Sequence, residues 1–214
     1  MKKHLRLLSA QLLAGALVLT ALSGPARAET SDSDPQLAAE WQTAWDTYKF
    51  YKDVPPAAGS GRSRAKDSIS ITIDAPLKTV FSAYSNVNNH LGMHSFLKRV
   101  VTHKTWTKYG KRNVNFTAVE EIPYEGSTVV SNTHAQQRID LDGFYYETDT
   151  WSVPNVVTHQ KIVFKKLTTG KTQVTEYLTF DADTALIDFV VAGGVSSHEA
   201  TQAGLKKAIE DGDI

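Results

Sequence analysis

Hydrophobic and polar positions alternate in one segment before the middle of the chain, and the alternation then changes to helical spacing. Isoleucines within residues 68–73 alternate with serine and threonine, which is the period of a half-buried strand. Asp74 is placed to cap the next helix, whose hydrophobic positions recur at helical spacing from Leu77 to Tyr84. Turn-forming residues follow at 86–89. The pattern predicts a strand, a short helix and a polar break.

A run of predicted strands follows this unit. The segments are separated by turn-forming residues such as Asp142-Gly143, which is a strong hairpin signal. Short turns join neighbouring strands in antiparallel order, so the run predicts a meander of about seven strands with the first included. The later strands are predicted at residues 96–105, 112–122, 128–140, 144–153, 156–167 and 172–180.

Two segments of helical period flank the strands. Residues 185–210 form one broad hydrophobic face and are long enough to cross a curved sheet, with Gly193 and Gly194 inside them. Residues 35–51 carry an aromatic stripe, and a Pro-, Gly- and Ser-rich linker follows at 54–62. The stripe must pack on the outside of the main domain or across the mouth of a pocket. Together these elements predict an α+β fold.

The order of strand, short helix, further strands and long helix over residues 67–211 resembles the START-like helix-grip superfamily, which includes START, polyketide cyclase and Bet v 1 proteins (SRPBCC). The resemblance implies a curved antiparallel sheet of about seven strands wrapped around a long C-terminal helix, with an extra N-terminal helix. It also implies a cavity that usually holds an apolar small molecule. We therefore expect a helix-grip domain at 67–214, preceded by a helix and linker at 29–66.

The first 28 residues have the pattern of a secretory signal peptide. Lys2, Lys3 and Arg6 form a basic start, residues 12–22 are apolar, and Ala26-Arg27-Ala28 is a cleavage signal. The apolar run is shorter than the ~20 residues of a membrane-spanning helix, which disfavours the alternative of an uncleaved anchor. The sequence predicts a periplasmic or secreted protein without stable membrane insertion after cleavage.

The charge and cysteine content narrow the class of protein further. The chain has 23 basic and 23 acidic residues and no cysteine. Loss of the signal segment removes four basic residues and no acidic one, which leaves a net charge of −4. Such a balance lacks the basic footprint of a nucleic-acid-binding protein. Without disulfides, the exported protein must derive its stability from a core.

Several strand and helix residues are candidates for a ligand site in the expected cavity. Aromatic side chains are usually ordinary core, but as a set around a cavity they are candidate ligand walls. Neither face of residues 128–139 is cleanly apolar, so polar groups must enter the interior, where Glu176 would need a partner such as Arg138 or a ligand. The glycine pair could give a ligand room or could mark a kink or a close helix–sheet contact. The predicted ligand-binding residues are Tyr84, His94, Phe96, Phe116, Arg138, Tyr146, Trp151, Glu176, Tyr177, Gly193 and Gly194.

Motifs for metal, cofactor or nucleophilic chemistry find little support in the sequence. His90 and His94 have a spacing that metal sites use, but Gly92 favours a loop and the zincin glutamate is missing. The sequence has neither a nucleophile elbow nor a phosphate-binding glycine loop. We therefore predict no metal, no cofactor and no catalytic residue.

Three functions remain open at this point. The first is an exported carrier that holds a hydrophobic or amphipathic, lipid-like molecule in an internal cavity. The second is an enzyme of the cyclase or aromatase type that uses pocket acid–base residues. The third is a protein-interaction module that docks through Trp41 and Trp45. The sequence names neither the ligand nor the oligomeric state.

Overall fold

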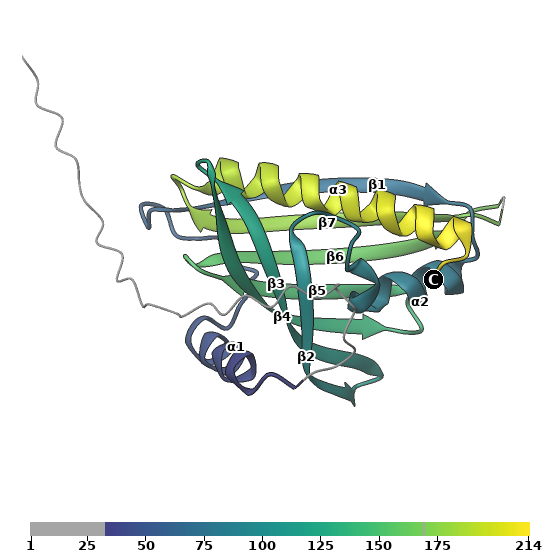
Figure 1. Cartoon of the computed structure of the whole chain (residues 1–214), viewed down its shortest axis with the longest axis horizontal. Coiled ribbons are helices and arrows are strands. Elements are labelled where there is room, and N and C mark those ends of the chain that lie inside the picture. The colour runs from purple at the N-terminus through teal and green to yellow at the C-terminus, as the bar shows by residue number, and fades with distance from the viewer. Residues whose placement is uncertain (1–32, 169) are drawn as a thin grey trace, which may run out of the picture. The chain divides into compact units, whose positions relative to one another are not determined.

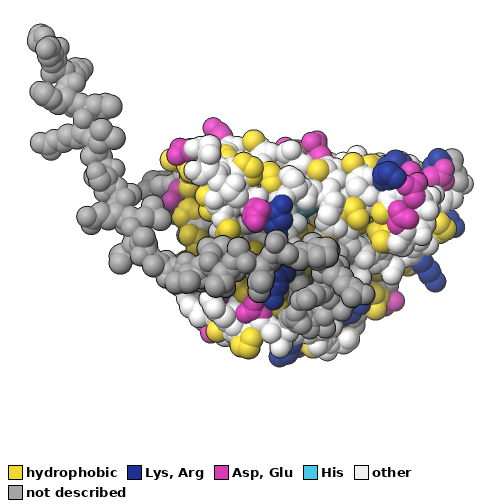
Figure 2. Space-filling model, viewed as in Figure 1, with side chains coloured by type: hydrophobic (Ala, Val, Ile, Leu, Met, Phe, Trp, Pro, Cys, Tyr) yellow, Lys and Arg dark blue, Asp and Glu magenta, His cyan; other side chains and the backbone are white. Residues whose placement is uncertain are grey.

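A computed structural model describes residues 33–168 and 170–214 of the chain. The predicted signal peptide at 1–28 lies outside the described residues. The described residues belong to one compact unit. Within residues 33–168 and 170–214, no helix combines the length and hydropathy that a membrane span requires. Acidic and basic side chains are interspersed over the face seen in Figure 2.

The molecule is built on one antiparallel sheet of seven strands, as the sequence predicts (Figure 1). Neighbouring strands follow the order β1-β7-β6-β5-β4-β3-β2, so β1 pairs with the last strand, and β1 and β2 lie at opposite edges of the sheet. The pairing of β2 with β3 shifts register twice. The strands are β1 (Arg62–Ile73), β2 (Leu97–Lys108), β3 (Lys111–Tyr124), β4 (Ser127–Asp140), β5 (Tyr145–Ser152), β6 (Val156–Lys166) and β7 (Thr172–Asp183).

Within the described residues, three α-helices and one 3₁₀ turn accompany the sheet: α1 (Pro35–Tyr48), α2 (Leu77–Ser85), η1 (Val87–His90) and α3 (Ile187–Asp211). The long α3 runs along β1 and β7 in Figure 1. A curved antiparallel sheet with a long C-terminal helix and an additional N-terminal helix is the predicted fold class, which is thus confirmed. We call the face of the sheet toward α2 and α3 the concave face and the opposite one the convex face.

The main core lies between the concave face and the two later helices. Phe81 and Tyr84 of α2 meet Phe164 of β6 edge to face, with ring centroids 5.2 and 5.5 Å apart. Leu205 and Ile209 of α3 belong to the same buried cluster. All buried residues of α3 lie in its second half, from Thr201 onward, so this half anchors the helix. Burial of such apolar side chains is the main source of stability in a fold without disulfides.

The start of α2 differs from the expected cap. The N-cap position is Pro76, which has no side-chain hydrogen bond, and Asp74 is not a cap. The Asp74 carboxylate instead accepts a hydrogen bond from Lys171 Nζ at 2.7 Å. Proline is pre-organised for a helix start and needs no N–H there, so the helix begins without the aspartate.

Helix α1 packs on the convex face rather than over the cavity, which is the first of the two packing alternatives. Trp41 is only 5% exposed and its Nε1–H donates to the Ala135 carbonyl oxygen at 2.8 Å. It packs in a cluster with Phe50 from the end of the helix and with Trp151 from β5. The helix ends at Tyr48, earlier than predicted, because Lys49 adopts a left-handed conformation with φ of 53°.

The boundary between linker and sheet also differs from the prediction. Strand β1 begins at Arg62, which pairs with Asp183 of β7, so residues 62–66 are strand rather than linker. Arg64 in this stretch forms a bidentate ion pair with Asp181, with distances of 2.6 and 2.7 Å. These contacts extend the sheet toward α1, which therefore belongs to the same packed unit.

Candidate ligand-binding cavity

The concave face carries a half-open cavity of about 120 Å³ beneath η1 and α3. One part of its wall is apolar and is formed by Val87, Leu97, Phe116, Ala118, Ala135 and Tyr146. The rest is polar and is formed by His90, His94, Glu120, Thr133, Gln137, Thr148, Thr150, Gln160, Glu176, Ser197, His198 and Thr201. The cavity can therefore offer both van der Waals contact and hydrogen bonds to the same small molecule.

Strand register brings the polar side chains of the floor together. Gln137 of β4 lies opposite Thr148 of β5, which in turn lies opposite Gln160 of β6. Side chains alternate between the faces of a sheet, so residues at matching register positions point to the same side. The result is a polar stripe across three neighbouring strands, with Tyr146 and Thr150 of β5 on either side of it.

A buried ion pair joins the floor of the cavity to its roof. The Glu176 carboxylate on β7 accepts hydrogen bonds from His198 Nδ1 at 2.8 Å and from Gln202 Nε2 at 2.9 Å. Burial opposes both charges, but the charge of His198 and its hydrogen bond hold the pKa of Glu176 below its usual value. Burial is likewise outweighed at His198, where Glu176 raises the pKa of the imidazole. The two groups thus stabilise each other as a carboxylate and an imidazolium.

Burial shifts the pKa values of three other titratable groups of the cavity in the direction of their uncharged forms. Burial raises the pKa of Glu120, against the effect of a hydrogen bond that Thr133 Oγ1 donates at 2.5 Å. Burial lowers the pKa of His90, whose Nε2 lies 2.9 Å from the Tyr84 carbonyl oxygen. Burial and the nearby His198 lower the pKa of His94 to about 4. A neutral imidazole has one donor and one acceptor nitrogen. His90 Nε2 donates to the Tyr84 carbonyl oxygen, which leaves Nδ1 as an acceptor, whereas His94 Nδ1 accepts from the Phe96 N–H at 3.3 Å, which leaves Nε2 as a donor.

One polar atom of the floor is left without a partner. Gln137 is 3% exposed, and its Oε1 is the one buried side-chain nitrogen or oxygen within residues 33–168 and 170–214 that makes no hydrogen bond. A buried polar atom without a partner costs about 1–3 kcal/mol, so such atoms are rare and require an explanation. Here the atom belongs to a residue that lines the cavity.

The structure gathers four of the predicted ligand-binding residues around this cavity: His94, Phe116, Tyr146 and Glu176. Two others lie just outside the cavity wall. Tyr84 is almost fully buried in the core, and its hydroxyl lies 3.5 Å from the Gln202 carbonyl oxygen. Phe96 packs edge to face on His94, with centroids 5.9 Å apart. That these residues contact a ligand stays a prediction.

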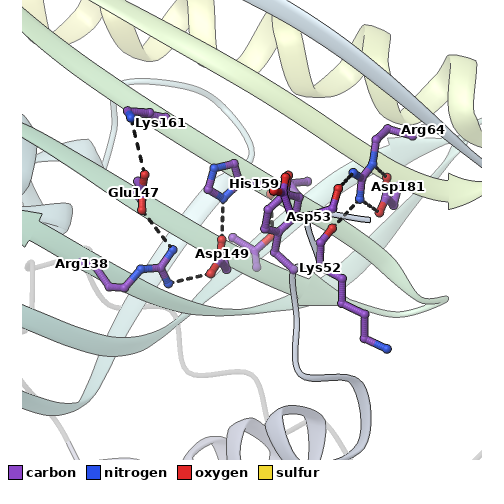
Figure 3. A network of polar contacts seen from close by, with 12 residues as sticks. Lys52, Asp53, Arg64, Arg138, Glu147, Asp149, His159, Lys161 and Asp181 are labelled. Carbon is purple, nitrogen blue, oxygen red and sulfur yellow. Dashed lines mark hydrogen bonds and ion pairs between the residues drawn. The ribbon is translucent and has the colours of Figure 1, made fainter. Parts of the chain in front are cut away.

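Three predicted residues lie on the wrong side of the sheet to line the cavity. Arg138 and Trp151 point to the convex face because they occupy the alternate positions of β4 and β5. Arg138 pairs there with Asp149 at 2.6 Å and Glu147 at 3.6 Å (Figure 3), so it is not the partner of Glu176. Tyr177 of β7 is 52% exposed, next to Glu176 in sequence but on the opposite face. The expectation that these side chains face the interior is wrong.

The glycine pair of α3 contributes a close contact rather than room for a ligand. A Cβ at Gly194 would lie 2.5 Å from Cε1 of Phe180, so only glycine lets the helix approach β7 at this point. A Cβ at Gly193 would have no atom within 4 Å. Neither glycine lines the cavity, and the close helix–sheet contact is the alternative that holds for Gly194.

Sequence reasoning missed Gln137, Glu120 and His198 as cavity residues. His198 looked isolated because its partner Glu176 lies 22 positions away in the sequence and in a different element. A signal for Gln137 was available: it shares the odd-numbered face of β4 with Ala135 and Ile139, both fully buried. The contact between His198 and Glu176 could not be predicted from the sequence, because it depends on how α3 crosses the sheet.

A second pocket and a cluster of metal ligands are the other features that could form a site. A larger groove of about 520 Å³ lies at the surface beside α2 and η1, lined by polar residues that include Asn86, Asn89 and Arg112. It has no buried titratable group in its lining, so it offers less to recognise a ligand. In the part of the chain that the structure describes, no cluster of three or more potential histidine, cysteine or carboxylate metal ligands occurs.

Comparisons with known proteins bear on the fold. No family model matches the sequence, and no curated protein matches it. Among solved structures, the Zhui aromatase/cyclase of Streptomyces sp. R1128 is 12% identical with a TM-score of 0.57, and the match covers 69% of this chain and 94% of the cyclase. A protein of Thermus thermophilus is 12% identical with a TM-score of 0.54, and that match covers 70% of this chain and 100% of the other.

A third solved structure is similar to the chain in fold. Ara h 8.0201 is 13% identical with a TM-score of 0.52, and the match covers 69% of this chain and 98% of the other. Each of the three matches leaves about 30% of this chain uncovered. The chain therefore has the START-like, polyketide cyclase and Bet v 1-like helix-grip fold.

Proposed function

We propose that this protein binds a small amphipathic molecule in the cavity on its concave face. The observation that carries the proposal is a cavity with an apolar wall on one side and hydrogen-bonding groups on the other. Apolar contact would supply ~25 cal/mol per Å² of buried area before the costs of binding, and the polar stripe would orient the guest. Solved proteins of this fold include an allergen and aromatase/cyclases, which is consistent with a small-molecule site.

The volume of the cavity favours a smaller ligand than the lipid-like molecule that the sequence predicts. A volume of about 120 Å³ is well below the ~300–1,000 Å³ of pockets that enclose drug-sized ligands. A whole lipid would need the cavity to expand, whereas a compact molecule fits without rearrangement. The proposal is therefore a small ligand with one polar end rather than a long acyl chain.

The binding proposal is tested by recovering the guest. The protein is purified from its own cells and examined by native mass spectrometry, followed by extraction and by titration with an apolar fluorescent probe. We expect a co-purifying small molecule or saturable probe binding. Ala135→Leu fills the cavity and should abolish binding, whereas Ala39→Leu, on the exposed side of α1, should not. A protein that releases nothing and binds no probe would contradict the proposal.

We also propose that the protein acts after export from the cytoplasm. The support is the basic start, the apolar stretch and the Ala26-Arg27-Ala28 signal of the first 28 residues. Mass spectrometry of the native protein should find an N-terminus at Glu29, and cell fractionation should place it in the envelope or the medium. An intact N-terminus in the cytoplasmic fraction would contradict export.

A second candidate function is acid–base catalysis of the cyclase or aromatase type. The observation that favours it is that the hydrogen-bonded pair of Glu176 and His198 meets the partly buried Glu120 at one cavity. Groups with displaced pKa values gather at catalytic sites. His198→Gln and Glu176→Gln should abolish a cyclisation rate on a free substrate while binding persists. Unchanged rates in both variants would remove this candidate.

The interaction-module hypothesis gains no support. Trp41, one of its two proposed docking residues, is buried against the convex face and hydrogen-bonded to Ala135. Trp45 stacks on it with ring centroids 5.4 Å apart. The aromatic stripe is thus engaged within the chain itself.

A further inference from the structure

We infer that His94 and His198 together bind the polar end of the ligand, and that this end carries a hydrogen-bond acceptor, such as a carbonyl or carboxylate oxygen. The inference deepens the proposed binding function and rests on it. It is carried by the hydrogen bonds that fix the two imidazole rings and by the position of both residues at the cavity.

The hydrogen bond at Nδ1 of His198 fixes the role of its other ring nitrogen. Nδ1 lies 2.8 Å from Oε2 of Glu176, and a carboxylate oxygen only accepts, so Nδ1 carries a proton. Glu176 is 4% exposed, and a carboxylate buried to this degree needs a cationic partner, which here is the imidazolium of His198. The imidazolium carries a second proton on Nε2. This Nε2–H makes no hydrogen bond within the described residues and is a free donor.

His94 offers a second donor from a different part of the chain. Its Nδ1 accepts a hydrogen bond from the backbone N–H of Phe96 at 3.3 Å. A ring nitrogen that accepts carries no proton, so the proton of the neutral imidazole lies on Nε2. This second Nε2–H also makes no hydrogen bond within residues 33–168 and 170–214. The loop after η1 and helix α3 thus each contribute one free N–H group.

Both donors are available to a molecule in the cavity. Gln137 Oε1 is the one fully buried side-chain nitrogen or oxygen without a partner in the part of the chain that the structure describes, so the unpaired Nε2 atoms of His94 and His198 retain accessible surface. Both residues line the cavity, and they lie close enough for the charge of His198 to lower the pKa of His94. A carbonyl oxygen has two lone pairs and can accept from both donors. The rings of Phe116 and Tyr146 in the same wall can contact the apolar part of the ligand.

The experiment compares two probes of equal shape. Acetophenone and α-methylstyrene differ only in a carbonyl oxygen in place of a methylene group, and each is titrated into the protein at pH 6 and followed by NMR. We expect acetophenone to bind more tightly. Its carbonyl carbon, labelled with ¹³C, should shift downfield on binding, because hydrogen bonds draw electron density toward the oxygen. The main readout is the ratio of acetophenone affinity to α-methylstyrene affinity, since general effects on the cavity cancel in a ratio.

The wild-type protein supplies a test that needs no substitution. As pH rises through the raised pKa of His198, Nε2 loses its proton while Nδ1–H stays hydrogen-bonded to Glu176, so Nε2 changes from a donor to an acceptor. The affinity ratio should therefore fall between pH 6 and pH 10. His94 stays neutral over this range because its pKa is about 4. The titratable groups that line the cavity around His198 are Glu176 of β7, Glu120 of β3, Tyr146 of β5, His90 of η1 and His94.

Glu120→Gln is the control for this pH profile. Glu120 is the other carboxyl group of the cavity, and burial raises its pKa. The fall of the affinity ratio should persist in this variant, because Glu176 still holds His198. A profile that becomes flat in Glu120→Gln would assign the titration to Glu120 and would overturn the role of His198.

Substitutions then separate the two donors. His94→Phe keeps a ring and removes the Nε2–H, and should lower the affinity ratio at pH 6 about tenfold, which equals ~1.4 kcal/mol. His198→Phe should lower it similarly and abolish its pH dependence. Because His198→Phe leaves the buried Glu176 without its charged partner, its folding is checked by circular dichroism, and His94→Phe with the wild-type pH profile decides if it does not fold. The matched control is His103→Phe, a half-buried histidine that bonds Thr117 on the convex face and should retain the wild-type ratio.

Benzoate, titrated in the same way, distinguishes the two sources of the acceptor oxygen. If benzoate binds more tightly than acetophenone and His94→Phe weakens its binding, the acceptor belongs to a carboxylic acid. The reverse order of affinities assigns it to a neutral carbonyl compound. Both orders agree with the inference.

Other outcomes overturn the inference and separate it from the function on which it rests. Equal affinities for acetophenone and α-methylstyrene, a ratio that neither pH nor His94→Phe changes, or an equal fall in His103→Phe each overturn the role of the two histidines, while the binding function stands because the probes bind. If no probe binds, the molecule recovered from the native protein decides. A molecule without an acceptor oxygen at its polar end, or one whose affinity His94→Phe leaves unchanged, overturns the inference alone. If nothing binds and nothing is recovered, both are wrong.

Discussion

The two faces of the sheet both carry buried polar groups, yet they differ in how those groups are completed. On the convex face, Asp149 accepts hydrogen bonds from Arg138 and from His159 Nδ1, each at 2.6 Å (Figure 3). Arg64 likewise pairs with Asp181 and donates to the backbone carbonyls of Lys52 and Asp53. Protein groups saturate this network, and α1 with its following turn covers the region beside it.

On the concave face, several polar side chains instead line a cavity. Glu176 and His198 complete each other there, but the polar stripe around Gln137 faces a cavity, and one of its acceptors has no partner within the described residues. Polar residues in strands therefore do not identify a site by themselves. The distinguishing property is whether the surrounding protein completes their hydrogen bonds. This contrast can be tested by substitutions on each face.

The largest expected effect is on the stability supplied by the convex face. Trp41→Ala removes a buried ring and its hydrogen bond to Ala135, and should lower the free energy of unfolding by about 3–5 kcal/mol in urea denaturation. Trp106→Ala is the matched control, since Trp106 is only half-buried on β2 and should cost far less. Equal losses in the two variants would show that α1 does not stabilise the fold.

The next effect tests the ion pair of the concave face. Glu176→Gln should lower stability by about 2 kcal/mol near pH 5.5, because His198 loses its charged partner. The contribution of Glu176 is present above its usual pKa of 4.5 and is lost as pH falls through its lowered pKa. That of His198 is complete below its usual pKa of 6.5 and is lost as pH rises through its raised pKa.

The difference between wild type and Glu176→Gln should therefore be widest between pH 4.5 and 6.5 and should shrink above that range. Unfolding free energies measured from pH 4 to pH 9 check this. His198→Gln is the companion variant and should lose the same pH-dependent part. A difference that stays constant across the range would contradict the ion pair.

A smaller loss is expected from the carboxylate at the centre of the convex network. Asp149→Asn should cost about 1–2 kcal/mol at pH 7, because Arg138 keeps Glu147 as a second partner. Although burial works in the other direction, bonds from His159 and Arg138 keep the pKa of Asp149 below its usual 3.8. Its contribution should thus persist at pH 4 and disappear only under stronger acid, as followed by thermal unfolding. Ligand affinity should not change.

The smallest effect concerns the corrected position of Tyr177. Tyr177→Ser alters an exposed side chain on the convex face and should change stability by less than ~0.5 kcal/mol. It should also leave probe binding by the cavity unchanged. A clear loss of binding would mean that Tyr177 reaches the ligand, and the assignment of the two faces would then have to be revised.

The elements of the fold could be predicted from the sequence because most of them keep their period. The isoleucines of β1 alternate, the turns between strands carry glycine or asparagine, and α3 changes to helical spacing. The end of α1 could not be predicted from helical period alone, because Lys49 and Phe50 adopt left-handed conformations that end the helix early. A left-handed residue depends on contacts such as the burial of Phe50, which the local sequence does not contain.

The faces of β4 and β5 could not be assigned from the sequence for a physical reason. Alternation marks the inner face only when the other face is in water. Here, α1 covers one side of these strands and the cavity occupies the other, so Trp151 and Tyr146 are both buried although they point in opposite directions. The sequence therefore predicted the position of Tyr146 at the cavity correctly and that of Trp151 wrongly.

The open edge of the sheet at β2 has a further consequence. A free edge presents unpaired backbone groups to which a strand from another molecule can add, and this is a common route to fibrous association. Strand β2 carries Lys98, Arg99, Lys104 and Lys108, and it breaks register twice against β3. Like charges and an uneven backbone make such addition unfavourable. The protein can thus expose this edge at high concentration without offering a template for growth.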